Sequence, residues 1–314
     1  MMMTSETVNS PRFVAESQND GEQIDTGLGL SPAKAALKRA RRHTGLKIGF
    51  GIILVMAFFA LFAPWLAPHD PYLQNLPLRL LPPAWVEGGE WRYLFGTDHL
   101  GRDYLSRIIY GARISLAIGV GAATVGAIIG VTLGLLAGYY GGWLDQAVNF
   151  LVTCQLAIPS LLLIMALVFV IGQSITVVIF VIGATHWVFY LVVTRSATLR
   201  LREMDFVAAA RSMGCSRFQV AVREVLPNLS NQIMVIFTLE VAIAILSEAT
   251  LSFLGLGIPS PMPSWGLMIA EGKTSMFFQP WLVILPGVAL FMLVIAVNLL
   301  GDGVRDVTVT DRRS

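Results

Sequence analysis

The sequence contains few charged residues for its length. Asp, Glu, Lys and Arg make up 13% of the 314 residues, hydrophobic residues make up 55%, and the formal net charge is only +2. An average soluble domain has about 25% charged residues, so the composition excludes an ordinary soluble domain and indicates an integral membrane protein. The basic residues stand beside apolar stretches instead of forming a separate basic region, and we therefore expect no nucleic acid partner.

Cysteine and histidine are also scarce. The two cysteines, Cys154 and Cys215, fall in an apolar stretch and in a polar loop, which disfavours a structural disulfide. The four histidines are scattered along the chain, and none stands at metal-ligand spacing from another. The sequence predicts no metal site and no catalytic set.

A nucleotide-binding P-loop is missing as well. Gly272-Lys273-Thr274 matches the end of that motif, but its first glycine would have to stand where Leu267 is. No other stretch offers the pattern. We therefore expect the chain to bind no cofactor of its own and not to be an enzyme.

What the sequence does contain is long apolar runs. A helix of about 20 apolar residues crosses the hydrocarbon core of a bilayer, and six stretches have roughly this length. The predicted spans are Ile48–Leu66, Ile114–Gly138, Val148–Ile171, Ile175–Thr194, Leu229–Ser247 and Trp281–Leu300. Gly172-Gln173-Ser174 separates the third span from the fourth, and Pro159 is placed to kink the third. The prediction is an all-α membrane protein with six transmembrane helices.

Basic residues predict the orientation of these spans. They gather before the first span, in the loop between the fourth and fifth spans, and after the last span. Six spans place all three segments on one side, and the positive-inside rule makes that side the cytoplasm. The long loop from Ala67 to Ala112 also carries arginines, but translocated loops of this length tolerate them. We expect a multi-pass protein with both termini in the cytoplasm.

The polar loop from Arg195 to Asn228 has the signals of an ordered helical hairpin. Its first helix is predicted from Glu203 to Met213, with Glu203 and Asp205 at the positive end of the helix dipole. Ala208-Ala209-Ala210 are strong helix formers, and Gly214 follows as a C-terminal stop. So ordered a polar segment in an apolar chain is typical of a docking surface for a soluble partner.

A second helix is predicted directly after the turn. Ser216 and Gln219 have the spacing of a capping box, which marks a helix start. Pro227 cannot occupy a helix interior without cost, and we take it as the end of this helix.

This hairpin resembles the EAA loop of ABC importer permeases, whose pattern is Glu-Ala-Ala, three residues, Gly, nine residues, Ile, one residue and Leu-Pro. Ala209 and Ala210, Gly214 and Leu226-Pro227 keep the family's residues and spacings. Ala208 replaces the family's Glu, and Glu224 replaces its Ile. The resemblance implies that the loop couples this chain to a cytosolic ATPase through helix shape and packing. A solvated basic loop that only follows the positive-inside rule is the alternative. The expected coupling residues are Glu203, Asp205, Ala208, Ala209, Ala210, Arg211, Gly214, Leu226 and Pro227.

Two further runs are similar to the dipeptide, oligopeptide and nickel group of these permeases. One is Gly96 to Asp103, which leads into a span, and the other is Leu246 to Gly257, followed by Pro263-Ser264-Trp265-Gly266. Their order points to the C-type permease subunit of the group, over about residues 45–305. Asp and Arg in the first run are expected to make structural, charge-assisted contacts where a helix enters the membrane.

The resemblance implies the fold of a type I ABC importer permease in the bacterial inner membrane. It also implies the partners: a homologous permease in a heterodimer, two cytosolic ATPase subunits that bind ATP-Mg, an extracytoplasmic substrate-binding protein, and membrane lipid. Peptides are the expected substrates, with nickel chelates, glutathione or other small solutes as alternatives. An ion-gradient-driven secondary transporter is the alternative of a different class, although the two halves of the chain show no inverted repeat.

The expected organisation has four parts. Residues 1–43 form a disordered cytoplasmic tail, and residues 44–112 form the first transmembrane helix and a periplasmic loop. Residues 113–304 form a five-helix core that contains the coupling loop 195–228, and residues 305–314 form a second cytoplasmic tail.

Ionisable and small residues inside the spans carry further predictions. Glu240 and His186 are candidates to line the translocation path, since an ionisable group in a membrane is costly and usually functional. Pairing of Glu240 with the partner permease is an equally weighted alternative. Gly126, Gly130 and Gly134 recur every four residues and predict a helix-packing face.

Overall fold

The structure is a computed structural model that describes residue 40 and residues 43–308. Nearly all of the tail predicted as disordered, and the last six residues, lie outside this part of the chain. Every regular element of the described part is helical. In order these are α2 (Thr44–Leu61), α3 (Ala63–Leu66), η1 (Leu76–Leu78), α4 (Tyr104–Tyr140), α5 (Gly142–Leu156), α6 (Ser160–Ile171), α7 (Ile175–Leu201), α8 (Asp205–Ser212), α9 (Arg217–Val220), η2 (Ala221–Val225), α10 (Leu226–Phe253), α11 (Trp265–Gly272), η3 (Lys273–Ser275) and α12 (Trp281–Thr308).

Five continuous helical stretches are long and apolar enough to cross a membrane, namely α2, α4, α7, Arg217–Phe253 and α12. The sixth crossing predicted from the sequence is a pair, α5 and α6, bent by 87°. The bend lies just before Pro159, because proline disfavours helical geometry in the residue that precedes it. The kink expected at Pro159 within the span Val148–Ile171 is therefore present, as a complete break between two helices.

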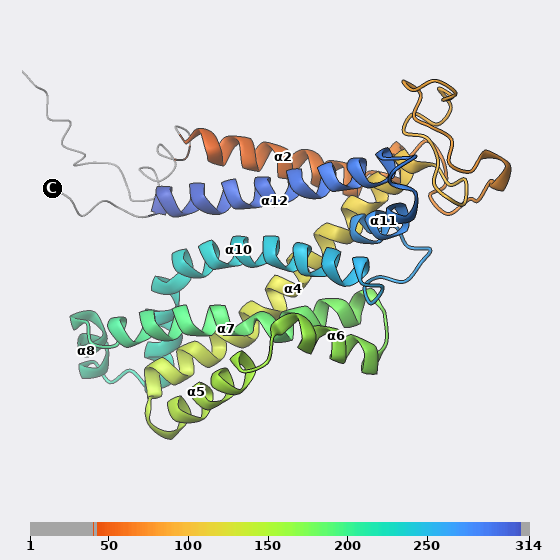
Figure 1. Cartoon of the computed structure of the whole chain (residues 1–314). Coiled ribbons are helices and arrows are strands. Elements are labelled where there is room, and N and C mark those ends of the chain that lie inside the picture. The colour runs from red at the N-terminus through yellow and green to blue at the C-terminus, as the bar shows by residue number, and fades with distance from the viewer. Residues whose placement is uncertain (1–39, 41–42, 309–314) are drawn as a thin grey trace, which may run out of the picture.

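The start of α2 lies beside the end of α12. His43 Nε2 and Asp306 Oδ2 are 2.9 Å apart, and Figure 1 shows both ends on the same side of the bundle as α8, opposite α11. An even number of passes must therefore connect them. The five continuous stretches give an odd number, so the bent pair of α5 and α6 must be the sixth pass.

The longest helix, α4, begins ten residues before the predicted span. Asp103 caps it, since its side chain accepts a hydrogen bond from the Ser106 amide at 3.0 Å. The helix ends at Gly141, whose φ of 66° is a conformation that other residues rarely adopt. Its 37 residues extend well beyond the hydrocarbon core on at least one side.

The glycine stripe of α4 packs against α7, as predicted. A Cβ at Gly130 would lie 2.2 Å from the Trp187 carbonyl oxygen, and one at Gly134 would lie 2.8 Å from the Leu191 carbonyl oxygen. No side chain fits at these separations, so the two backbones approach closely only because glycine stands there.

Pro227 does not end a helix, contrary to the prediction. The chain continues as one apolar helical stretch from Arg217 to Phe253. The Leu226 amide donates to the carbonyl oxygen of Ala221, five residues earlier, so η2 is a π-helical turn. This widened turn directly before the proline changes the register of the backbone hydrogen bonds, and α10 then starts with Pro227 in its first turn, where its missing amide is tolerated.

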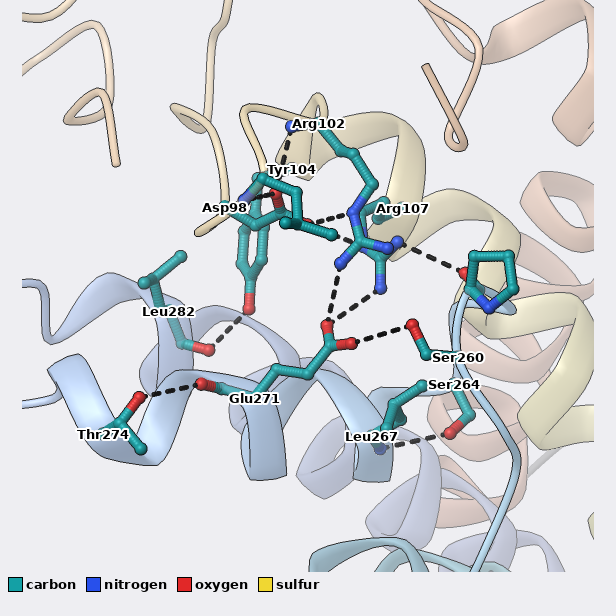
Figure 2. Close-up of polar contacts among 12 residues, drawn as sticks. Asp98, Arg102, Tyr104, Arg107, Ser260, Ser264, Leu267, Glu271, Thr274 and Leu282 are labelled. Carbon is teal, nitrogen blue, oxygen red and sulfur yellow. Dashed lines mark hydrogen bonds and ion pairs between the residues drawn. The ribbon is translucent and has the colours of Figure 1, made fainter. Parts of the chain in front are cut away.

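Buried ion pairs connect residues 98–107, around the start of α4, to α11. Figure 2 shows the guanidinium groups of Arg102 and Arg107 between Asp98 and Glu271. Arg102 Nε donates to Asp98 at 2.6 Å. The Nη2 atoms of Arg102 and Arg107 both donate to Glu271 Oε2, each at 3.1 Å. Both arginine side chains are fully buried. The structural contacts expected of this Asp and Arg run are therefore present, and Glu271 on α11 completes them.

Candidate functional site

The turn after α8 is fixed by local hydrogen bonds. The Gly214 amide donates to the Arg211 carbonyl oxygen at 3.0 Å, and the Cys215 amide donates to that of Ala210 at 3.2 Å. These two bonds and the φ of 86° at Gly214 define a Schellman motif. The helix runs from Asp205 to Ser212, slightly shorter than predicted, with its glycine stop at the predicted residue.

The capping box at the start of α9 is present. Gln219 donates its amide to Ser216 Oγ at 3.3 Å, and the Ser216 amide donates to Gln219 Oε1 at 3.0 Å. The C-terminus of α8 and the N-terminus of α9, which flank a short turn, are thus both capped by local hydrogen bonds. The hairpin is an ordered element and not a flexible loop.

The inner face of the hairpin packs on the membrane helices. Val207 and Ala210 on α8 join a buried cluster with Leu135 and Tyr139 near the end of α4. The remaining buried members are Ala197, Val220, Ala221, Val225 and Leu229. The cluster therefore anchors α8 to α4, to α7 and to the helical stretch formed by α9, η2 and α10.

Arg211 adds a polar contact to this anchor. Its guanidinium lies 5.3 Å from the centre of the Tyr139 ring, and its Nη2 donates to the tyrosine hydroxyl at 3.1 Å. A cation over an aromatic face is attracted by the ring quadrupole. The contact joins the last turn of α8 to the last turn of α4.

The outer face of the hairpin exposes large apolar side chains. Met213 is 78% exposed and Phe218 is 64% exposed, on either side of the turn between α8 and α9. Ala208 and Ala209 are exposed on α8 beside them. Arg211 and Arg217 are exposed neighbours of Met213 and Phe218 in the sequence, and exposed apolar side chains with a polar rim are typical of protein-binding surfaces.

The structure separates the predicted coupling residues into two groups. Most are exposed, but Ala210 is buried in the core and Leu226 is half-buried. Exposed members are Glu203, Asp205, Ala208, Ala209, Arg211, Gly214 and Pro227. The sequence reasoning had overlooked Met213, Phe218 and Tyr139. Met213 and Phe218 could have been identified as surface contacts, because they are large apolar residues within a polar loop.

Glu240 and His186 lie against each other inside the chain. Glu240 Oε2 is 3.0 Å from His186 Nδ1, and the two residues are 2% and 7% exposed. The pair joins α7 to α10, and the hydroxyl of Tyr190, one turn further along α7, is buried without a partner among the described residues. Glu240 thus has a partner within its own chain, which neither interpretation of the sequence had foreseen.

One group of side chains has the donor atoms of a metal site. Ligand atoms of Asp98, His99 and Glu271 lie within 4.8 Å of one another. Both carboxylates are already bound by Arg102 and Arg107, however. Two guanidinium groups at this position repel a cation, so the arrangement is better suited to an ion-pair network than to a metal.

Comparison with known proteins gives consistent matches. Residues 130–313 match the family model described as binding-protein-dependent transport system inner membrane component, and residues 31–83 match the N-terminal TM domain of oligopeptide transport permease C. The di/tripeptide transport system permease protein DppC of Pseudomonas aeruginosa is 40% identical over 276 residues, which are 88% of this chain and 91% of the relative.

Two further relatives have similar coverage. The dipeptide transport system permease protein DppC of Haemophilus influenzae is 40% identical over 85% of this chain and 90% of its own length. The glutathione transport system permease protein GsiD of Pectobacterium atrosepticum is 38% identical over 85% of this chain and 86% of its own length.

Proposed function

The chain belongs to the family of binding-protein-dependent transport system inner membrane components, within its dipeptide, oligopeptide and nickel group, and on this premise we propose that it carries short peptides across the bacterial inner membrane. It is a multi-pass permease subunit, and the printed names of two close relatives specify dipeptides or tripeptides. Glutathione, which the name of a third relative specifies, is the second candidate substrate.

The observation that carries the proposed coupling role is the two-sided hairpin between α7 and α10. Its inner face is built into the cluster of α4, α7 and α10, whereas its outer face exposes Met213 and Phe218. An ATPase subunit that binds the outer face and moves on ATP closure would therefore displace the ends of three membrane helices together.

The partners follow from the same proposal. Two cytosolic ATPase subunits bind ATP-Mg and supply the free energy, a homologous permease forms the other half of the path, and an extracytoplasmic binding protein delivers the peptide. The hairpin and both termini then face the cytoplasm, in agreement with the basic residues around them. The hairpin residues from Glu203 to Pro227 make the ATPase contact, and the four-part organisation expected from the sequence belongs to the same proposal.

Reconstitution of the complete complex into proteoliposomes tests this function. Uptake of a labelled dipeptide should require ATP and the binding protein, and it should persist when ionophores remove ion gradients. Uptake by the chain alone, abolished by ionophores, would instead support a secondary transporter and refute the proposal. Competition by glutathione and by a nickel chelate distinguishes the alternative substrates.

A further inference from the structure

A cavity with polar side chains on one wall opens on the first turns of α10. Its volume is about 550 Å³, and its walls come from α7, α10 and α12. Three carboxamide side chains, Asn228, Asn231 and Gln232, stand on the α10 side. Val193 and Arg305 contribute the α7 and α12 sides. Typical pockets for small ligands have volumes of about 300–1,000 Å³, so a short peptide has room here.

The carboxamides share one face of α10 and are exposed. Residues at positions i, i+3 and i+4 lie above one another on a helix, and all three side chains are solvent-exposed in this chain. Asn228 donates to the Glu224 carbonyl oxygen at 2.6 Å. Within the described part of the chain, the side-chain amides of Asn231 and Gln232 make no hydrogen bond.

The wall formed by these carboxamides belongs to the long apolar helical stretch from Arg217 to Phe253. Gln232 is two helical turns from the buried Glu240, and its neighbours Ile233, Val235 and Ile236 are apolar. Unpaired amides that face hydrocarbon are costly, because lipid offers no hydrogen-bond partner. A water-filled path is the environment in which such a wall is tolerated.

The wall is also directly connected to the hairpin. α10 continues without a break from α9 and η2, so the exposed Phe218 and the carboxamides belong to one helical stretch. The π-helical turn that separates them is a feature that frequently occurs at functional sites. A displacement of the hairpin would therefore move the wall, whereas a ligand on the wall would bias the position of the hairpin.

We propose that Asn231 and Gln232 form an exit site that binds a peptide on its way to the side of the hairpin. The proposal rests on the proposed function and deepens it. Carboxamides carry a donor and an acceptor, so they match the peptide backbone irrespective of its side chains. Backbone recognition suits a permease whose binding protein selects the substrate.

The first test removes the polarity of the wall and keeps side chains of similar length. We expect the double variant Asn231→Leu/Gln232→Met, in the complete complex with its binding protein, to lower the maximal rate of dipeptide uptake about tenfold, which corresponds to about 1.4 kcal/mol for two lost hydrogen bonds. The KM should stay unchanged, because the binding protein captures the peptide. Met234→Leu is the matched control, since Met234 is exposed on the same helix but lies outside this cavity.

The second test measures occupancy directly. Cys154 and Cys215 are both exposed and free, so they are first replaced by serine, and Asn231→Cys is then labelled with a membrane-impermeant maleimide in the complete complex. Labelling should be slowed by a millimolar dipeptide and unchanged by a single free amino acid, which lacks a peptide bond. Labelling of a Met234→Cys variant should not respond to the dipeptide.

The outcomes separate the two proposals. Absence of ATP-dependent dipeptide uptake by the unmodified complex would refute the proposed function, and the exit site with it. Normal uptake by the unmodified complex, together with unaltered uptake by the double variant or equal labelling of Asn231→Cys with and without dipeptide, would refute the exit site alone.

Discussion

Arg211 of α8 binds Tyr139 of α4 through both its charge and a hydrogen bond. The guanidinium lies 5.3 Å from the ring centre and donates to the hydroxyl at 3.1 Å. These residues are 72 positions apart in the sequence, and their contact joins the candidate coupling helix to the longest membrane helix.

Replacement of Tyr139 should weaken the coupling between ATP hydrolysis and transport. Tyr139→Leu removes both the ring and the hydroxyl, and a loss of about 1 kcal/mol of coupling free energy would raise the ATP hydrolysed per peptide about fivefold. Tyr139→Phe keeps the cation–ring contact and should give an intermediate value. Parallel assays of ATPase activity and uptake in proteoliposomes measure the ratio. Equal ratios for the Leu variant and the unmodified protein would contradict the prediction.

Ala209 and Ala210 should respond differently to a bulky charge. Ala209 is exposed, so Ala209→Glu should abolish capture of the ATPase in a pull-down while the protein still folds and inserts. Ala210 is 4% exposed, so Ala210→Glu buries an unpaired carboxylate and should destabilise the membrane helices themselves. Thermal unfolding in detergent separates the two effects. Normal ATPase capture by Ala209→Glu would show that this residue is outside the docking surface.

The buried pair on α7 and α10 should stabilise the bundle. Glu240→Ala and His186→Ala should each lower the unfolding temperature, and the double variant should lose less than the sum. Interhelical hydrogen bonds in membranes contribute about 1–2 kcal/mol in model peptides, which is the expected coupling in this double-mutant cycle. Strict additivity of the two substitutions would mean that the pair makes no net contribution.

Glycine at position 130 should be irreplaceable even by alanine. A Cβ there would lie 2.2 Å from the Trp187 carbonyl oxygen, so Gly130→Ala must push α4 away from α7 and should cost about 1–3 kcal/mol of stability. Gly51→Ala is the control, because no atom lies within 4 Å of the added carbon and alanine favours the helix. Similar unfolding temperatures for both variants would contradict the close packing of α4 on α7.

Glu271 should be essential for the arrangement shown in Figure 2. Glu271→Gln leaves two buried guanidinium groups with Asp98 as their one remaining carboxylate in the cluster, and the loss of one partner in a buried ion pair costs about 3–5 kcal/mol. We expect proteolysis within residues 67–103 to become faster. Glu87→Gln, at an exposed position of the same segment, should leave the rate unchanged and controls for the loss of a charge.

Local signals account for the parts of the site that were predicted. The Gly214 stop and the box formed by Ser216 and Gln219 are present where the sequence placed them. Each depends on residues that are at most five positions apart, so the chemistry of the side chains determines the geometry directly. Pro227 was misinterpreted because its effect depends on the hydrogen-bond register of the preceding turn.

Contacts between distant residues account for what was missed. Ala210 faces the core and Ala209 does not, although both alanines belong to one motif. The face of α8 that is buried depends on where α4 and α7 lie, and no local pattern encodes that position. The partners of Glu240 and of Arg107 are 54 and 164 residues away, respectively.

The sequence by itself determined that this protein lies in a membrane, how many passes it makes, and where the ordered polar hairpin begins and turns. Composition and the length of apolar runs can be read without any tertiary contact, and helix caps act within one or two helical turns. Only the tertiary structure decided the 87° bend between α5 and α6, the burial of Ala210, and the pairing of Arg211 with Tyr139. These features depend on the rotation and depth of each helix against its neighbours, which are set by side-chain packing over the whole bundle.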